Sequence, residues 1–121
     1  MEQSRNLKKN EIEIIEYLAN VAQYPLVNDW YNYYQATPMD DGGMGSLLLT
    51  PVNVSSKERE FQSQIADCII EDTDGMDVII SLNIDQNRNL FELDVWKCDF
   101  SPLIGKLDKG RIKRKKIQDL Q

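Results

Sequence analysis

Carboxylates are the only side chains in this sequence that are numerous enough to suggest a chemical role. The chain contains no histidine, which excludes Ser-His-Asp and Cys-His nucleophilic sets. Its two cysteines, Cys68 and Cys98, cannot complete a four-ligand zinc site by themselves. We expect both cysteines to be small, buried apolar side chains, because free cysteine is commonly buried.

The carboxylates are concentrated in the middle of the chain. Residues 40–100 contain thirteen acidic and four basic side chains, a net charge of −9, whereas residues 105–121 contain seven basic and two acidic ones, a net charge of +5. A body this acidic repels nucleic acid and attracts basic partners. The charge pattern therefore predicts a protein partner and no nucleic acid.

Two loops resemble parts of known ligand sites. The glycine-rich run at residues 41–46 lacks the lysine and the following helix that a phosphate-binding loop requires, which favours a turn or bulge. The run at residues 72–77 resembles part of a calcium loop, but Asn83 stands where the closing glutamate belongs, which favours a hairpin turn. We therefore expect neither a metal nor a cofactor.

Glu92 and Asp94 alternate along one predicted strand and so share a face, about 6.5–7 Å apart at Cα. That spacing permits glycosidase-like acid–base chemistry, but a solvated or partner-facing acidic face is favoured. Trp96 lies on the same face, either as an interface anchor or as a core residue beneath a helix; both alternatives remain open. We predict no catalytic residue, and a partner-binding set that consists of Asp72, Asp74, Asp85, Glu92, Asp94 and Trp96.

Hydrophobic periodicity predicts the elements that must position these residues. Apolar residues at helical spacing predict a helix over residues 8–23, which Pro25 ends. Residues 52–62 are polar and fit either a loop or one helical turn. Strands are predicted at 30–36, 45–50, 63–72, 76–85 and 90–98, and tight turns join the last three into a meander. The fold is thus expected to be α+β, an N-terminal helix packed on an antiparallel sheet of about five strands, with a core that contains Ile12, Ile15, Ala19, Ile80, Leu82, Leu93 and Val95.

A chain of 121 residues is expected to form one domain. We predict a domain over residues 1–104 and a basic, flexible tail over residues 105–121, with residues 107–121 dispensable for the fold. The polar N-terminus has no apolar segment typical of a signal peptide, and no apolar run approaches the length of a membrane span. A cytoplasmic protein without a membrane partner is therefore expected.

Two sequence strings resemble a group of small bacterial proteins for which no activity is established. In that group a helix precedes "DGGMGSL" and the chain closes with "LFELDxWKxDFSPL"; the corresponding residues here are 41–47 and 90–103. The resemblance covers about residues 7–104 and implies a shared fold, without a catalytic or binding residue that could be carried over.

In size and acidity the chain also resembles immunity proteins of contact-dependent and other polymorphic toxin systems. This resemblance implies an immunity protein that binds and neutralises a bacterial toxin domain, such as a nuclease, through its acidic surface. The alternative is a stand-alone ligand-binding or regulatory module with a homo-oligomeric interface. An enzyme that uses Glu92 and Asp94 ranks third, and we predict that the chain is not an enzyme.

Overall fold

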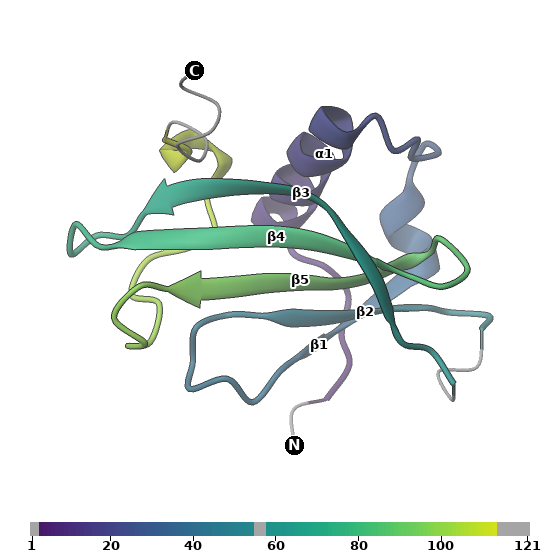
Figure 1. Ribbon diagram of the computed structural model, residues 1–121. Coiled ribbons are helices and arrows are strands. Elements are labelled where there is room, and N and C mark those ends of the chain that lie inside the picture. The colour runs from purple at the N-terminus through teal and green to yellow at the C-terminus, as the bar shows by residue number, and fades with distance from the viewer. Residues whose placement is uncertain (1–2, 55–57, 114–121) are drawn as a thin grey trace.

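One α-helix packs against a five-stranded antiparallel sheet, which confirms the expected α+β class (Figure 1). The computed structural model describes residues 3–54 and 58–113. No helix within these residues is long and apolar enough to cross a membrane. The elements are α1 (Lys9–Ala22), the 3₁₀ helix η1 (Trp30–Tyr33), β1 (Tyr34–Pro38), β2 (Leu47–Pro51), β3 (Phe61–Glu71), β4 (Asp77–Asp85), β5 (Leu90–Lys97) and the 3₁₀ helix η2 (Lys109–Arg111).

The strands lie in the order β1-β2-β5-β4-β3. The last three strands form the predicted meander, and the β1–β2 hairpin adds to it through pairing of β2 with β5. Gly75 has a φ of +85° in the β3–β4 turn, a conformation that glycine adopts without a steric penalty. This turn places the acidic residues that follow β3 next to the end of β5.

The helix forms where the sequence predicts it, because its apolar residues share one face. Ile14, Ile15 and Leu18 are fully buried, whereas Ile12 is half-buried and packs at the margin of the core. At the N-terminus the Glu11 carboxylate accepts a hydrogen bond from the Lys8 backbone N–H at 2.8 Å. An acid suits this end of the helix dipole. The helix covers one face of β3 and β4 (Figure 1).

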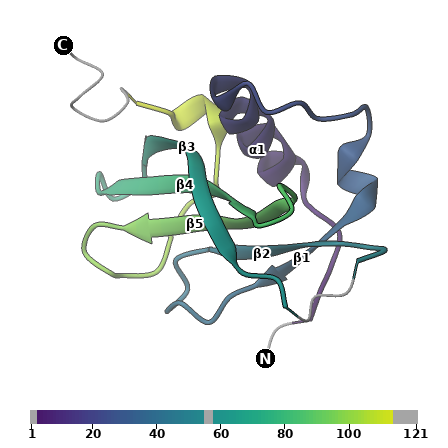
Figure 2. The same ribbon diagram turned by 45° about the vertical axis from the view of Figure 1, so that its right-hand side comes forward.

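The buried face of β4 has the predicted alternation, with Val78, Ile80, Leu82 and Ile84 all in the core. The opposite face of the same strand is also buried at Ser81, Asn83 and Asp85. β3 has two register shifts against β4, and its first half crosses over the ends of β4 and β5 (Figure 2). The other predicted core residues, Ile15, Ala19, Leu93 and Val95, are buried as expected.

The strand predicted at residues 30–36 is wrong in its first half. Trp30–Tyr33 form η1, and β1 begins only at Tyr34. The Trp30 indole is buried, donates to Glu16 Oε2 at 3.0 Å, and packs edge-on against the rings of Tyr31 and Tyr34. Aromatic residues favour strands on average, but here the packing of one ring into the core determines the backbone.

Both edges of the sheet are covered by segments near the ends of the chain. At β1, Arg5 and Ala36 exchange two backbone hydrogen bonds of 2.8 Å, and at β3, the Lys113 N–H donates to Ile69 O at 2.7 Å. Ile112 forms a bridge with Ile70. Exposed strand edges invite pairing with other chains, and these two segments occupy part of each edge.

The domain boundary predicted at residue 104 therefore falls within the packed structure. Leu107 is only 4% exposed, and its carbonyl accepts a hydrogen bond from Asn10 Nδ2 at 2.9 Å. Residues 105–113 thus pack on the domain, whereas the expectation that residues 107–121 are dispensable for the fold stays a prediction. The predicted flexibility of residues 114–121 concerns a segment outside the described residues.

Replacement of Leu107 tests whether this segment stabilises the fold. Leu107→Ala should lower the free energy of unfolding by about 2–5 kcal/mol, the usual cost of truncating a buried leucine. Ile104→Ala is the matched control, because Ile104 lies in the same segment and is 64% exposed. Urea unfolding measures both variants, and equal stability of the two would contradict the packed position of Leu107.

Candidate functional site

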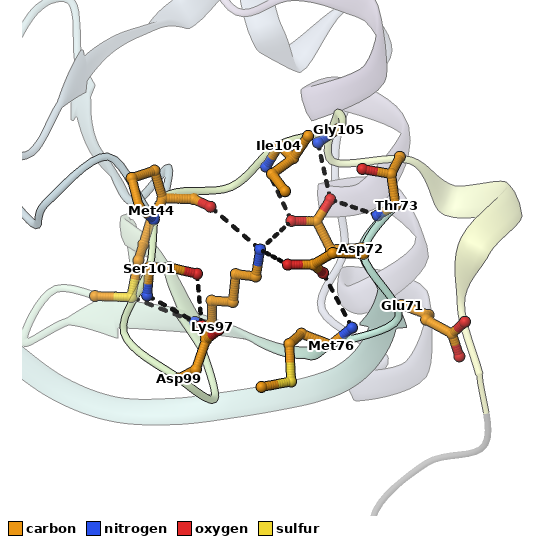
Figure 3. Close-up of polar contacts among 12 residues, drawn as sticks. Met44, Glu71, Asp72, Thr73, Met76, Lys97, Asp99, Ser101, Ile104 and Gly105 are labelled. Carbon is orange, nitrogen blue, oxygen red and sulfur yellow. Dashed lines mark hydrogen bonds and ion pairs between the residues drawn. The ribbon is translucent and has the colours of Figure 1, made fainter.

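Lys97 is the last residue of β5, and its side chain is fully buried on the core side of the sheet. Its ammonium lies 2.8 Å from Asp72 Oδ2 and 2.7 Å from Asp74 Oδ2, and it donates to the Pro102 carbonyl at 3.3 Å. Both carboxylates come from the turn between β3 and β4. We call this arrangement the Lys97 clamp; Figure 3 shows Lys97 and Asp72 facing each other.

Asp72 also binds backbone groups of the segment that follows β5. Its carboxylate accepts hydrogen bonds from the N–H groups of Ile104, Gly105 and Thr73 at 2.7–2.9 Å (Figure 3). Burial alone would raise the pKa of Asp72, but these N–H groups and the Lys97 ammonium outweigh burial and hold the pKa well below its ordinary value. Asp72 therefore fastens the segment after β5 to the β3–β4 turn as an ionised carboxylate.

The two carboxylates of the Lys97 clamp lie within the calcium-like run of residues 72–77. The Lys97 ammonium takes the position between Asp72 and Asp74 that a cation would otherwise need. Within residues 3–54 and 58–113, no group of three or more His, Cys, Asp or Glu side chains is arranged to hold a metal ion.

A second buried ion pair lies at the other end of β4. Arg59 Nε is 2.8 Å from Asp85 Oδ2, and the exposed fractions of the two side chains are 4% and 0%. The same guanidinium donates to the carbonyls of Leu49 in β2 and Leu90 in β5. Direct pairing of β2 with β5 is confined to Leu47 and Leu48, so Arg59 bridges the two strands beyond that point.

The glycine-rich loop is occupied by its own aspartate. The Asp41 carboxylate accepts hydrogen bonds from the N–H groups of Met44 and Ser46 at 3.0 and 2.9 Å. Burial raises the pKa of Asp41, but these bonds, those of Ser46 first, lower it overall. Because a carboxylate already holds the N–H groups that a phosphate would need, this loop is the turn that the sequence favoured.

The same loop packs on the end of the second sequence string. The Leu103 N–H donates to the Gly43 carbonyl at 3.0 Å, and a Cβ on Gly43 would lie 3.2 Å from Pro102 Cβ. Gly43 also has a φ of +82°. A side chain at this position would therefore be both strained and crowded, which accounts for the glycine.

The structure separates the six predicted partner-binding residues into two groups. Asp72 and Asp85 are buried in ion pairs within the chain, and Asp74, although its side chain is 33% exposed, is bound to Lys97. Asp72 and Asp85 are therefore enclosed by the fold, whereas Asp74 is bound to Lys97 at the surface. Glu92, Asp94 and Trp96 lie together on one face, as predicted.

That face is the side of the sheet opposite α1. Cross-strand pairing aligns Trp96 with Ile79 and Ile69 in an apolar row, and it aligns Asp94 with Ser81 and Asp67 in the next row. Trp96 is 48% exposed, so it is not the core residue of the second alternative. We call this surface the open face; it consists of Asp67, Ile69, Ile79, Glu92, Asp94, Trp96 and Phe100.

Phe100 extends the apolar row beyond the end of β5. It is 66% exposed, and its ring centroid lies 5.6 Å from that of Trp96. On the acidic side, Glu92 accepts a hydrogen bond from Asn83 Nδ2 at 3.0 Å, which fixes its carboxylate on the sheet. The open face therefore presents a pair of aromatic rings beside a row of carboxylates.

The cysteines do not share one environment. Cys68 is buried as expected, but Cys98 is exposed, which corrects the prediction that both lie in the core. Cys98 follows the last residue of β5, where the sheet ends and no element of the described chain covers it; its N–H still bonds the Asp77 carbonyl at 3.0 Å.

Sequence reasoning missed Lys97, Arg59 and Asp41 as structural residues. For Lys97 a signal was available, because strand alternation places it on the same face as Leu93 and Val95. A lysine on an apolar face requires a carboxylate partner, and the acids of the β3–β4 turn were the candidates nearest in the predicted meander. Arg59 lies in a polar segment without periodicity, so no comparable signal exists for it.

Comparison with protein families gives one match. A family model described as a domain of unknown function, DUF6984, matches residues 4–107. The comparisons with curated proteins and with solved structures give no match. The matched region contains the Lys97 clamp, the Arg59–Asp85 pair and the open face.

Acid titration tests the Lys97 clamp. Folding lowers the pKa of Asp72 below its ordinary value of 3.8. The stability that the ionised carboxylate contributes to the fold is therefore fully present above pH 3.8, and it is lost as the pH falls through the lowered pKa. Asp72→Asn should therefore be less stable at pH 7 and lose less stability than the wild type between pH 4 and pH 2. Chemical unfolding at stepped pH measures this, with the exposed Asp40→Asn as control; parallel curves for Asp72→Asn and wild type would contradict it.

Replacement of Arg59 by lysine tests the second ion pair. A lysine keeps the charge but cannot donate at once to Asp85, Leu49 and Leu90 in the planar geometry of a guanidinium. Arg59→Lys should therefore lower the free energy of unfolding by about 3 kcal/mol, toward the cost of breaking a buried pair. Arg88→Lys, at an exposed turn position, should change it by less than about 0.5 kcal/mol; similar losses in both variants would refute the bridging role.

Proposed function

The chain belongs to the DUF6984 family, whose description assigns no activity, and we propose that it is a protein-binding module that acts as an immunity protein. In this proposal the open face binds a bacterial toxin domain in the cytoplasm and blocks it. A nuclease domain of a contact-dependent or related toxin system is the partner that fits best.

The observation that carries this proposal is the pair of exposed aromatic rings beside carboxylates on the sheet face opposite α1. Trp96 and Phe100 expose 48% and 66% of their surface while they contact each other. Tryptophan is strongly enriched among the residues that dominate binding energy at protein interfaces. An exposed apolar row with a polar border is typical of an interaction surface.

Charge favours a basic partner. The chain has a net charge of −6, and the open face includes Asp67, Glu92 and Asp94. A nuclease must present basic residues to its polyanionic substrate, so an acidic protein can occupy that surface and prevent substrate binding. Complementary charge also speeds the encounter of the two proteins.

Rigidity of the open face supports the same proposal. All its residues except Phe100 lie on the neighbouring strands β3, β4 and β5, and the two buried ion pairs hold the turns at both ends of β4. A surface that is already ordered loses little conformational entropy on binding. By contrast, a symmetric homodimer through this face would bring like charges together, which argues against the homo-oligomeric alternative.

The experiment is co-purification with the toxin domain encoded beside the gene, together with rescue of growth in cells that express this toxin. Trp96→Ala should weaken binding about thirtyfold or more, which corresponds to at least about 2 kcal/mol for a central aromatic residue. Tyr33→Ala is the matched control, since Tyr33 is 56% exposed on η1 and lies outside the open face.

Charge reversal separates steering from apolar contact. Glu92→Lys together with Asp94→Lys should lower the association rate more than it raises the dissociation rate, and higher salt should slow association of the wild type. Absence of binding and of rescue would refute the immunity proposal. A concentration-dependent dimer that Trp96→Ala dissociates would favour the homo-oligomeric module.

A further inference from the structure

A hollow lies on the helix side of the molecule, away from the open face. Its volume is about 790 Å³, and it is open to solvent. The second half of α1 forms one wall, and the segment from Tyr24 to Tyr31, which leaves the end of the helix, forms the other. We call it the Trp30 hollow, and Figure 2 shows the two chain segments that enclose it.

The Trp30 hollow has an acidic lining. Glu16 and Asp29 are among the residues that line it, and none of its described lining residues is a lysine or an arginine. It also adjoins the C-terminal end of α1, whose last turn contains no basic residue. The helix thus supplies no cation of its own at the negative end of its dipole, and the hollow favours a positively charged ligand.

The half-buried rings of Tyr24 and Tyr31 supply aromatic surface to the hollow, whereas Trp30 is only 3% exposed and backs its wall. The Trp30 ring is held edge-on by Tyr31 and Tyr34 at centroid distances of 5.9 and 6.0 Å. Aromatic faces attract guanidinium and ammonium groups. A planar guanidinium can also stack on a ring while it donates to a carboxylate.

Both carboxylates are fixed and still have acceptor capacity. Glu16 Oε2 accepts from the Trp30 indole at 3.0 Å, and Asp29 Oδ1 accepts from the Tyr31 hydroxyl at 3.0 Å. A carboxylate has about four acceptor positions on its two oxygens. Each therefore keeps free lone pairs for a donor-rich ligand while its neighbour holds it in place.

We infer that the Trp30 hollow is a second binding site, which takes the arginine side chains of an extended basic peptide segment. The volume lies within the range of pockets that hold small ligands. The carboxylates of Glu16 and Asp29, the rings of Tyr24 and Tyr31, and the negative end of the helix dipole all suit a guanidinium. This site is independent of the proposed function, because none of its lining residues belongs to the open face.

The two tryptophans of the chain allow each surface to be observed separately. The Trp30 indole N–H reports on the hollow through its bond to Glu16, and the Trp96 indole reports on the open face. We would titrate ¹⁵N-labelled protein with acetylated, amidated tri-arginine and follow both indole signals by NMR. Tri-citrulline is the matched probe, because citrulline has nearly the shape of arginine without its charge.

The expected result is a saturable shift of the Trp30 signal with tri-arginine and no such shift with tri-citrulline. The double variant Glu16→Gln, Asp29→Asn keeps both acceptors for Trp30 and Tyr31 but removes the charges. It should bind tri-arginine about fivefold to tenfold more weakly, as expected for two partly exposed ion pairs. If the double variant does not fold, Asp29→Asn alone should weaken binding about twofold to fivefold.

The inference would be overturned by an unmoved Trp30 signal at millimolar peptide, by equal shifts with both peptides, or by unchanged affinity of the charge-neutral variant. A shift confined to Trp96 would also overturn it, while it would leave the open-face proposal intact. Conversely, failure of toxin binding at the open face would not affect the Trp30 signal.

Discussion

The Lys97 ammonium between Asp72 and Asp74 is the interaction on which the arrangement of this sheet depends. It joins the end of β5 to the β3–β4 turn, and through Asp72 the same group holds the segment that follows β5. That segment in turn packs on the glycine-rich loop before β2. A buried charge is costly without a partner, so displacement of the β3–β4 turn or of the segment after β5 would leave buried charged groups without their partners.

The Arg59–Asp85 pair performs the corresponding task at the opposite end of β4. Its guanidinium satisfies carbonyls of both β2 and β5 where their backbones separate, so the β1–β2 hairpin joins the meander partly through a side chain. The two ion pairs use acids that the sequence offers as candidates for recognition. Of the predicted partner-binding residues, Glu92, Asp94 and Trp96 lie outside these pairs, and the register of β4 and β5 gathers them on the open face.

The helix and the meander were predictable because periodic burial dominates there. Residues such as Leu18 in α1 and Ile80 in β4 are apolar at the spacing that their element requires, and their partners are near in sequence. Prediction failed at Trp30–Tyr33, where burial of one indole outweighed strand propensity. It failed again for Asp72 and Asp85, because a carboxylate on the surface and one in an ion pair look alike in sequence. The packing of Leu107 was missed because a single apolar residue in a basic segment carries no periodicity.

The pairing of the two edge strands with flanking segments has a consequence for the order of folding during synthesis. Synthesis proceeds from the N-terminus, and domains begin to fold as they emerge. The segment around Arg5, which pairs with β1, is present before any strand exists, so that edge can close as soon as β1 forms. The residues that pair with β3, Ile112 and Lys113, are made after all five strands. On the ribosome the β3 edge is therefore closed after the β1 edge, and neighbouring nascent chains meet it as an open strand until Ile112 and Lys113 have emerged.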